Sequence, residues 1–449
     1  MKPNIILIMT DDQGYGELSC LGNTDFKTPN FDDLAANGAL FTDFYSNSPV
    51  CSPSRAALLT GRYPGNAGVR AILSGHRRAS GINQNAPTIA SVLKQNGYYT
   101  GLVGKWHLGL AEQSRPNNNG FDYFYGFMAG CIDYYSHIFY WGANANGQNP
   151  THDLWENENE IYNNGKYFTE LVTEKSVEFI KDNKDEPFML FTAYNAPHYP
   201  LHAPGKYVDR FKDLPEDRRI LAAMIAAVDD GVGEIVKTLK EQGIYENTII
   251  FFQSDNGPSR ESRNFLDGTQ GVYNGSSAGK FKGHKFSLFE GGIRIPAILS
   301  YPAEVNSCVI NKPCAAMDIF PTICELAGVD YSGYVDGLSI TELLKGGDED
   351  VHDMLFWEMD KQTAVRCGKY KLVLNGVTEE QTKKEKAVSE YDKPETVFLA
   401  DIETDPAETI NIATKYPNIT KELTNEALKW RKGIESEWTE KWAKNYSVT

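Results

Sequence analysis

The sequence is short of positive charge, of closely spaced cysteines and of long apolar runs. It has 44 Lys and Arg residues against 60 Asp and Glu residues in a chain of 449, a formal net charge of −16. A field of this sign repels nucleic acids and anionic membrane surfaces. We therefore expect neither nucleic acid nor a membrane as a partner, and an anionic substrate needs a locally basic pocket. No apolar stretch is long enough to cross a bilayer, so no membrane-spanning segment is predicted.

The seven cysteines are scattered and include no C-x-x-C pair, which argues against a zinc site and a dense disulfide framework. Their odd number leaves at least one thiol unpaired. Cys308 and Cys314 are close enough in sequence to form a disulfide, although two unrelated thiols are an equally good interpretation.

A predicted strand begins almost at Met1, and no basic region, long apolar core or small-residue cleavage site precedes it. Two explanations stay open. The protein works in the cytoplasm, or it is periplasmic or secreted and its leader is absent from this sequence. We expect the second.

Short apolar runs rich in β-branched and aromatic residues predict buried strands, and helical patterns lie between them. The predicted strands are Asn4–Thr10, Tyr98–Trp106, Pro187–Tyr194, Thr248–Ser254 and Ile295–Tyr301, and the predicted helices include Thr88–Asn96, Thr169–Asn183 and Ile220–Gln242. Strands that alternate with helices predict an α/β sandwich around a large, mostly parallel central sheet.

The polar and acidic segment Gly346–Asp353 predicts a domain boundary. We expect a catalytic domain over residues 1–348 and a smaller C-terminal subdomain over residues 349–449. In the latter, Thr363–Leu374 and Thr396–Asp401 have strand patterns and Lys421–Trp442 has a helical one. These elements predict a small antiparallel sheet with a terminal helix.

Polar side chains follow four of the predicted strands. Asp11 and Asp12 follow the first strand, Lys105 and His107 the second, His198 the third, and Asp255 with Asn256 the fourth. Ligands of such sheets bind beyond the carboxyl ends of the strands, so we expect these residues to converge on one site. Asp11, Asp12, Asp255 and Asn256 offer oxygen ligands without soft partners, which suits calcium or magnesium better than zinc. Taken singly, each pair also fits an ordinary helix cap or turn.

The segment SPVCSPSRAALLTGRYP, residues 48–64, closely resembles the signature of the type I sulfatases, in which a modifying enzyme reads C-x-P-S-R and oxidises the cysteine to formylglycine. The alternative is a buried structural cysteine before a helix. The resemblance continues through PNIILIMTDDQGYGE, GLVGKWHLG, APHYPLHAP, IIFFQSDNG and GHKFSLFEGGIRIP. It implies the fold of the alkaline phosphatase superfamily, a calcium ion, and a formylglycine-generating or anaerobic sulfatase-maturating enzyme as a partner. Glu17 stands where the family more often has aspartate, and we expect no effect on the metal.

The same resemblance implies a role for each site residue. Cys51, as a hydrated aldehyde, is the nucleophile and joins the four oxygen ligands at the metal. Arg55 holds the diol, Lys105 and Lys285 bind the sulfate oxygens, His198 protonates the leaving oxygen, and His107 takes the proton that lets the sulfated residue expel sulfate. Ser136 and His202 are expected to contact the substrate, although a lone histidine more often caps a loop.

The predicted function is the hydrolysis of a sulfate ester on a sugar, at the end of a chain, with a preference for galactose or N-acetylgalactosamine sulfates. A phosphoester or phosphonate hydrolase of the same superfamily is the first alternative, because phosphate and sulfate share tetrahedral geometry. Such relatives commonly hold two zinc ions through extra histidines and use Thr or Ser, so the Asp and Asn ligand set and Cys51 argue against this alternative, although some phosphonate hydrolases also use formylglycine. An inactive carbohydrate-binding protein is the alternative from another class, and it predicts gaps in the set of site residues.

Overall fold

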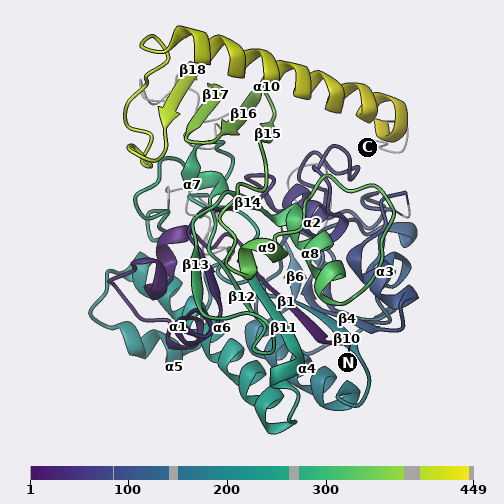
Figure 1. Cartoon of the computed structure of the whole chain (residues 1–449). Coiled ribbons are helices and arrows are strands. Elements are labelled where there is room, and N and C mark those ends of the chain that lie inside the picture. Colours follow the sequence, from purple (N-terminus) through teal and green to yellow (C-terminus); the bar gives the residue numbers. More distant parts are fainter. Residues whose placement is uncertain (1, 84, 141–149, 262–272, 379–394, 444–449) are drawn as a thin grey trace.

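A ten-stranded sheet forms the centre of the protein, with helices on both faces (Figure 1). The computed structural model describes residues 2–83, 85–140, 150–261, 273–378 and 395–443. The strand order is β13-β2-β12-β11-β1-β10-β4-β5-β8-β9. This architecture confirms the predicted α/β sandwich.

Five neighbouring strands in the middle of the sheet are parallel. They are β11 (Thr248–Ser254), β1 (Asn4–Thr10), β10 (Phe188–Ala193), β4 (Tyr99–Lys105) and β5 (Tyr123–Phe127). Because they run in the same direction, their carboxyl ends share one edge of the sheet. Every residue of β1 is buried, as expected for a strand with a helical layer on each side.

Some of the outer strands run opposite to these five. Next to β11, β12 (Ala297–Ser300) is antiparallel to it, and β2 (Ala39–Phe41) is antiparallel to β12. At the other edge, β8 (Trp155–Glu156) and β9 (Asn159–Glu160) form a short hairpin beside β5. β13 (Cys308–Ile310) pairs in parallel with β2. The apolar run 295–301 was predicted as a strand, but its sequence does not encode its antiparallel direction.

Alternate residues of β1 reach two separate apolar layers, because successive side chains of a strand point to opposite faces. Ile5, Leu7 and Met9 belong to one layer and Ile6 and Ile8 to the other. The first layer includes α2 (Cys51–Thr60), α3 (Ile89–Gln95) and α8 (Ile319–Leu326). The second includes α1 (Pro29–Ala36), α4 (Phe168–Asn183) and α6 (Glu216–Glu241).

The C-terminal part of the chain forms a four-stranded antiparallel sheet in the order β15-β16-β17-β18, covered by α10. The strands are β15 (Leu355–Met359), β16 (Gln362–Cys367), β17 (Tyr370–Gly376) and β18 (Glu395–Asp401), and the helix is α10 (Pro417–Glu437). The single strand predicted over 363–374 is therefore two strands joined by a turn at Gly368, whose φ is 52°. The sequence patterns missed β15.

The C-terminal end of α10 and the helical turn after it lie beside the part of the chain that holds the ten-stranded sheet (Figure 1). Trp442, which is buried, packs on Gly68, where an added Cβ would lie 2.5 Å from its ring. Ile434 packs on Gly65 in the same way. The C-terminal helix thus contacts the loop that follows α2.

All seven cysteines are free thiols, so Cys308 and Cys314 form no disulfide. Among the described residues, no helix is long and apolar enough to span a bilayer.

Candidate active site

Two acidic turns lie side by side at the carboxyl edge of the sheet. β1 and β11 are neighbours with Thr10 opposite Ser254, so the residues that follow them meet. The backbone N–H of Asp12 donates to Asp255 Oδ1 at 3.1 Å, and Asn256 Nδ2 donates to Asp12 Oδ1 at 2.7 Å. Asp12 has φ 62°, a left-handed conformation that turns its side chain toward this pair. The predicted convergence of the two turns is present.

Two buried cations lie against these carboxylates. Lys105, the last residue of β4, donates to Asp11 Oδ2 at 2.5 Å. Arg55 donates to Asp255 Oδ2 from Nε at 3.0 Å and from Nη2 at 2.8 Å. Despite burial, Asp255 and Asp11 keep the pKa of Arg55 above its usual value, and Asp11 does the same for the pKa of Lys105. Both side chains therefore stay charged.

Cys51 is the first residue of α2, and Arg55 follows one turn later on the same face. Val50 is extended and Gly61 ends the helix in the left-handed conformation, with φ 65°. The positive end of the helix dipole thus faces the site. Burial raises the pKa of the Cys51 thiol to about 12. An unmodified thiol here stays protonated near neutral pH.

His107 presents one unoccupied ring nitrogen. Its Nε2 lies 3.1 Å from the Leu73 carbonyl oxygen, so this nitrogen donates, and Nδ1 has no hydrogen-bond partner among the described residues. Burial, followed by the charges of Lys105 and Arg55, lowers the pKa of His107 well below its usual value. A Cβ at position 130 would lie 2.8 Å from Cε1 of His107, so glycine permits the close approach of the ring. The result is a neutral imidazole with a free acceptor.

His198 and Lys285 lie on the other side of Asp12. His198 Nδ1 lies 2.8 Å from the Tyr199 carbonyl oxygen and donates to it, which leaves Nε2 as the acceptor for Lys285 Nζ at 3.3 Å. Lys285 also donates to Asp12 Oδ2 at 2.9 Å. Burial and then the Lys285 charge lower the pKa of His198 well below its usual value.

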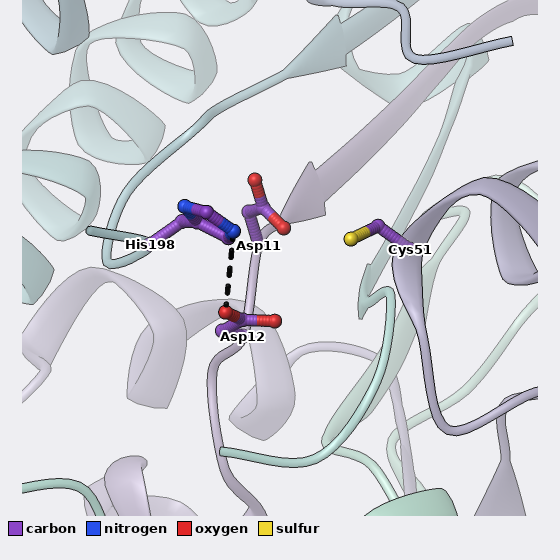
Figure 2. A group of neighbouring side chains, drawn as sticks. All are labelled: Asp11, Asp12, Cys51 and His198. Atoms are coloured by element: carbon purple, nitrogen blue, oxygen red, sulfur yellow. Dashed lines mark ion pairs between the residues drawn. The ribbon is translucent and has the colours of Figure 1, made fainter. Parts of the chain in front are cut away.

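The oxygen donors suit a divalent cation. Asp11 Oδ1 and Asn256 Oδ1 are buried and have no hydrogen-bond partner in the described part of the chain. Burial, followed by repulsion from Asp255, raises the pKa of Asp11, and a cation would remove this repulsion. Ligand atoms of Asp11, Asp12, Cys51 and His198 all lie within 4.8 Å of one another, and Figure 2 shows the Cys51 sulfur pointing toward the aspartates.

Comparison with known proteins places this geometry in a family. The profile described as Sulfatase matches residues 3–329, and the one described as N-sulphoglucosamine sulphohydrolase, C-terminal, matches residues 280–433. The chain belongs to the sulfatase family. It is a type I sulfatase of the alkaline phosphatase superfamily, and therefore a sulfuric ester hydrolase.

The sulfatase spans 71% and 74% of the length of two curated relatives that it matches. N-acetylgalactosamine-6-sulfatase of Mus musculus is 33% identical to it over 394 residues, which cover 82% of this chain and 71% of the relative. Arylsulfatase J of Mus musculus is 29% identical over 463 residues, with 94% and 74% covered. The solved structure of Ps i-CgsB in complex with k-i-k-neocarrahexaose has a TM-score of 0.81 at 33% identity and covers 96% of the sulfatase and 93% of its own chain.

The two residues expected to contact the substrate share one carboxylate. Ser136 Oγ donates to Asp133 Oδ1 at 2.9 Å, and His202 Nδ1 lies 3.3 Å from Asp133 Oδ2. His202 remains partly exposed, whereas His198 is buried, and the Tyr134 hydroxyl donates to the His198 carbonyl. Asp133 therefore contacts both predicted substrate-binding residues, although it was not itself among the predicted site residues.

Glu261 was missed as well. Its Oε2 accepts from Lys285 Nζ at 2.8 Å. The only sequence signal is its position a few residues beyond Asn256, which by itself indicates nothing. Glu17 accepts from Arg218 Nη1 and from the backbone N–H of Ser277, both at 2.6 Å.

Proposed function

We propose that this sulfatase removes sulfate from the end of a sulfated carbohydrate, with calcium bound and with Cys51 converted to formylglycine. The observation that carries the proposal is the position of Cys51 at the start of α2, facing two pairs of oxygen donors and three buried cations. Sulfate monoesters are stable anions, so their attack needs cations on the nonbridging oxygens, a strong nucleophile and a proton for the leaving alcohol.

Modification supplies what the thiol lacks. With its pKa at about 12, the Cys51 thiol is a poor source of thiolate, whereas a hydrated aldehyde offers two hydroxyl groups. Arg55, one helical turn later, is placed to hold this diol, and Asp255 is placed to accept a proton from it. A serine at this position would attack once but would lack the second hydroxyl.

Asp11, Asp12, Asp255, Asn256 and the modified residue 51 would hold the calcium ion. When bound, calcium lowers the cost of ionising one hydroxyl and offsets charge on the sulfate. His198 Nε2 also lies near these ligands, 3.6 Å from Asp12 Oδ2. We assign it to the leaving oxygen instead, because the remaining donors are hard oxygens of the kind calcium prefers.

The cations and histidines divide the remaining steps. Lys105 and Lys285 bind the nonbridging oxygens of the ester. The lowered pKa of His198 makes its protonated form a strong acid, so it transfers a proton readily to the leaving oxygen as the S–O bond breaks. His107 Nδ1 then accepts the proton of the second hydroxyl, the C–O bond to sulfate breaks, and the aldehyde forms again.

The substrate class is proposed from the surroundings and from the relatives. Ser136 and His202 lie on one wall near His198 and offer a hydroxyl and a ring nitrogen to a sugar. One relative is a sulfatase of N-acetylgalactosamine 6-sulfate and one solved structure holds a carrahexaose. We therefore favour galactose or N-acetylgalactosamine sulfates, a periplasmic or secreted location, and a maturation enzyme of either formylglycine-forming type as the partner.

The decisive experiment measures sulfate release from saccharides that each carry one sulfate at a defined position. We expect release from a chain-terminal galactose or N-acetylgalactosamine sulfate, and none by the Cys51→Ala variant. Matched aryl phosphate and aryl sulfate esters test the phosphohydrolase alternative, which predicts faster phosphate release. Mass spectrometry of the peptide containing residue 51, from active enzyme, must show the aldehyde; unaltered cysteine alone would refute the nucleophile.

A further inference from the structure

Glu261 stands on the solvent side of Lys285, and the mechanism above gives it no role. Its Oε2 accepts from Lys285 Nζ at 2.8 Å and from Ser259 Oγ at 3.1 Å, and its Oε1 accepts from the Tyr199 hydroxyl at 3.3 Å. The side chain of Glu261 is 11% exposed, against 3% for Lys285. A carboxylate therefore borders the buried ammonium group on its outer side.

The partners of Lys285 fix how far this carboxylate lies from a bound ester. An ammonium group has three N–H donors, and here they meet Asp12, His198 and Glu261. If a sulfate oxygen of the bound ester replaces His198 as an acceptor of Lys285, Glu261 remains a second acceptor on the same nitrogen. Two acceptors on one tetrahedral nitrogen lie about 4.6 Å apart at usual hydrogen-bond lengths. The sulfate would thus lie within about 5 Å of the Glu261 carboxylate.

The charges of the pocket show what Glu261 changes. Among the described residues of the pocket, the carboxylates of Asp11, Asp12 and Asp255 contact the cations Arg55, Lys105 and Lys285. The carboxylate of Glu261 adds a further negative charge beside Lys285, about 5 Å from the bound ester. It therefore opposes a ligand with two negative charges more strongly than a sulfate monoester with one.

We propose that Glu261 is a specificity-determining residue that matches the pocket to a monoanionic ester and rejects a second negative charge on the ester or beside it. The inference rests on the proposed function, because it takes the pocket to bind a sulfate ester. Among saccharides, Glu261 would favour a sugar with one sulfate and a free hydroxyl next to it. A sugar with a second sulfate or a carboxylate at that neighbouring position would bind more weakly.

The test compares two ligands that differ by one charge. Calcium-loaded enzyme is titrated calorimetrically with methyl sulfate, a monoanion, and with inorganic sulfate, a dianion. At about 5 Å, one unit charge changes a binding constant on the order of a hundredfold before salt screening, so we expect about tenfold or more in buffer. The measured quantity is the dissociation constant of inorganic sulfate divided by that of methyl sulfate. In Glu261→Gln this ratio should be about tenfold or more lower than in the wild type.

Three further variants separate charge from positioning. Glu261→Asp keeps the charge and should keep the wild-type ratio of the two constants, whereas Glu261→Ser removes it and should behave like Glu261→Gln. Glu234→Gln removes an exposed carboxylate on α6, paired with Lys237, and should leave the ratio unchanged. If Glu261 only positioned Lys285, both ligands would weaken together and an unchanged ratio would overturn the proposal.

The binding measurement needs no turnover, so the two proposals can fail separately. An unchanged ratio overturns the role of Glu261 while sulfate release from the saccharide panel stands. A shifted ratio with no release from any saccharide supports the role of Glu261 and overturns the carbohydrate substrate.

Discussion

Neutralising Asp255 should destabilise the protein even in the absence of metal. Asp255 and Arg55 are both fully buried, and two donors of the guanidinium reach the same carboxylate oxygen at 3.0 and 2.8 Å. Although burial opposes it, Arg55 holds the pKa of Asp255 below its usual value. Removing one partner of a buried ion pair costs about 3–5 kcal/mol. Asp11 Oδ1, 3.7 Å from Arg55 Nη2, compensates in part, so for Asp255→Asn we expect the lower end, about 3 kcal/mol.

Urea denaturation of chelator-treated protein measures this cost without the contribution of bound calcium. Arg55→Met should cost a similar amount, because it leaves the buried carboxylate without its cation. The double variant should lose about 2–3 kcal/mol less stability than the two single variants lose in sum, because it leaves no unpaired charge. The exposed pair Glu234 and Lys237 is the control, where the coupling should stay below about 0.5 kcal/mol. A loss of less than about 1 kcal/mol in Asp255→Asn, or additive losses in the double variant, would refute the reasoning.

Three more predictions concern the metal, the second half of the reaction and pH. Calcium at about a hundred times its dissociation constant should add about 2.7 kcal/mol to the free energy of unfolding, and Asn256→Ala should reduce this gain. If calcium stabilised the wild type and Asn256→Ala equally in melting experiments, Asn256 would be excluded as a ligand. His107→Ala should release one equivalent of alcohol and then stop, with sulfate retained on residue 51 in the mass spectrum, whereas steady turnover would contradict its role. Burial raises the pKa of Glu17 from 4.5 to about 7, so the folded state keeps a proton that the unfolded state has lost between these values. Stability is therefore lost as pH rises through this range, by about 3 kcal/mol from Glu17. The free energy of unfolding in urea, plotted against pH, should therefore fall less steeply for Glu17→Gln than for the wild type. Parallel curves for the two proteins would contradict the raised pKa of Glu17.

The C-terminal sheet supports the loop that carries Lys285. Gln362 Nε2, in β16, donates to the Phe286 carbonyl at 2.7 Å, and Phe286 has φ 75°. Beyond this, Lys371 lies between Glu290 and Glu408 at 2.8 and 3.1 Å, with all three side chains buried. These contacts join the C-terminal sheet to the segment that carries Lys285, which we propose to bind the sulfate. Residues 349–449 remain a proposed subdomain, in close contact with the rest of the chain.

Much of the site was predictable because its signals are local. A strand buried on both sides is an uninterrupted apolar run, so β1 and β11 were predicted with the bounds that the structure has. Parallel strands place their carboxyl ends on one edge, which brought the two acidic turns together. The positions of Cys51 and Arg55 one helical turn apart follow from the helical period.

Only the tertiary structure decided how these groups are paired and charged. The free nitrogen of His107 depends on the carbonyl of Leu73, and the contact of Glu261 with Lys285 spans 24 residues. The direction of β12, the existence of β15 and the packing of Trp442 on Gly68 depend likewise on distant segments. Sequence periodicity indicates which side of a helix or strand is buried. A hydrogen bond or ion pair between distant segments can be assigned only once the positions of both segments in the fold are known. For this protein the sequence indicated the buried central strands and the residue types of the candidate site, and the fold determined which of their atoms are left without a partner.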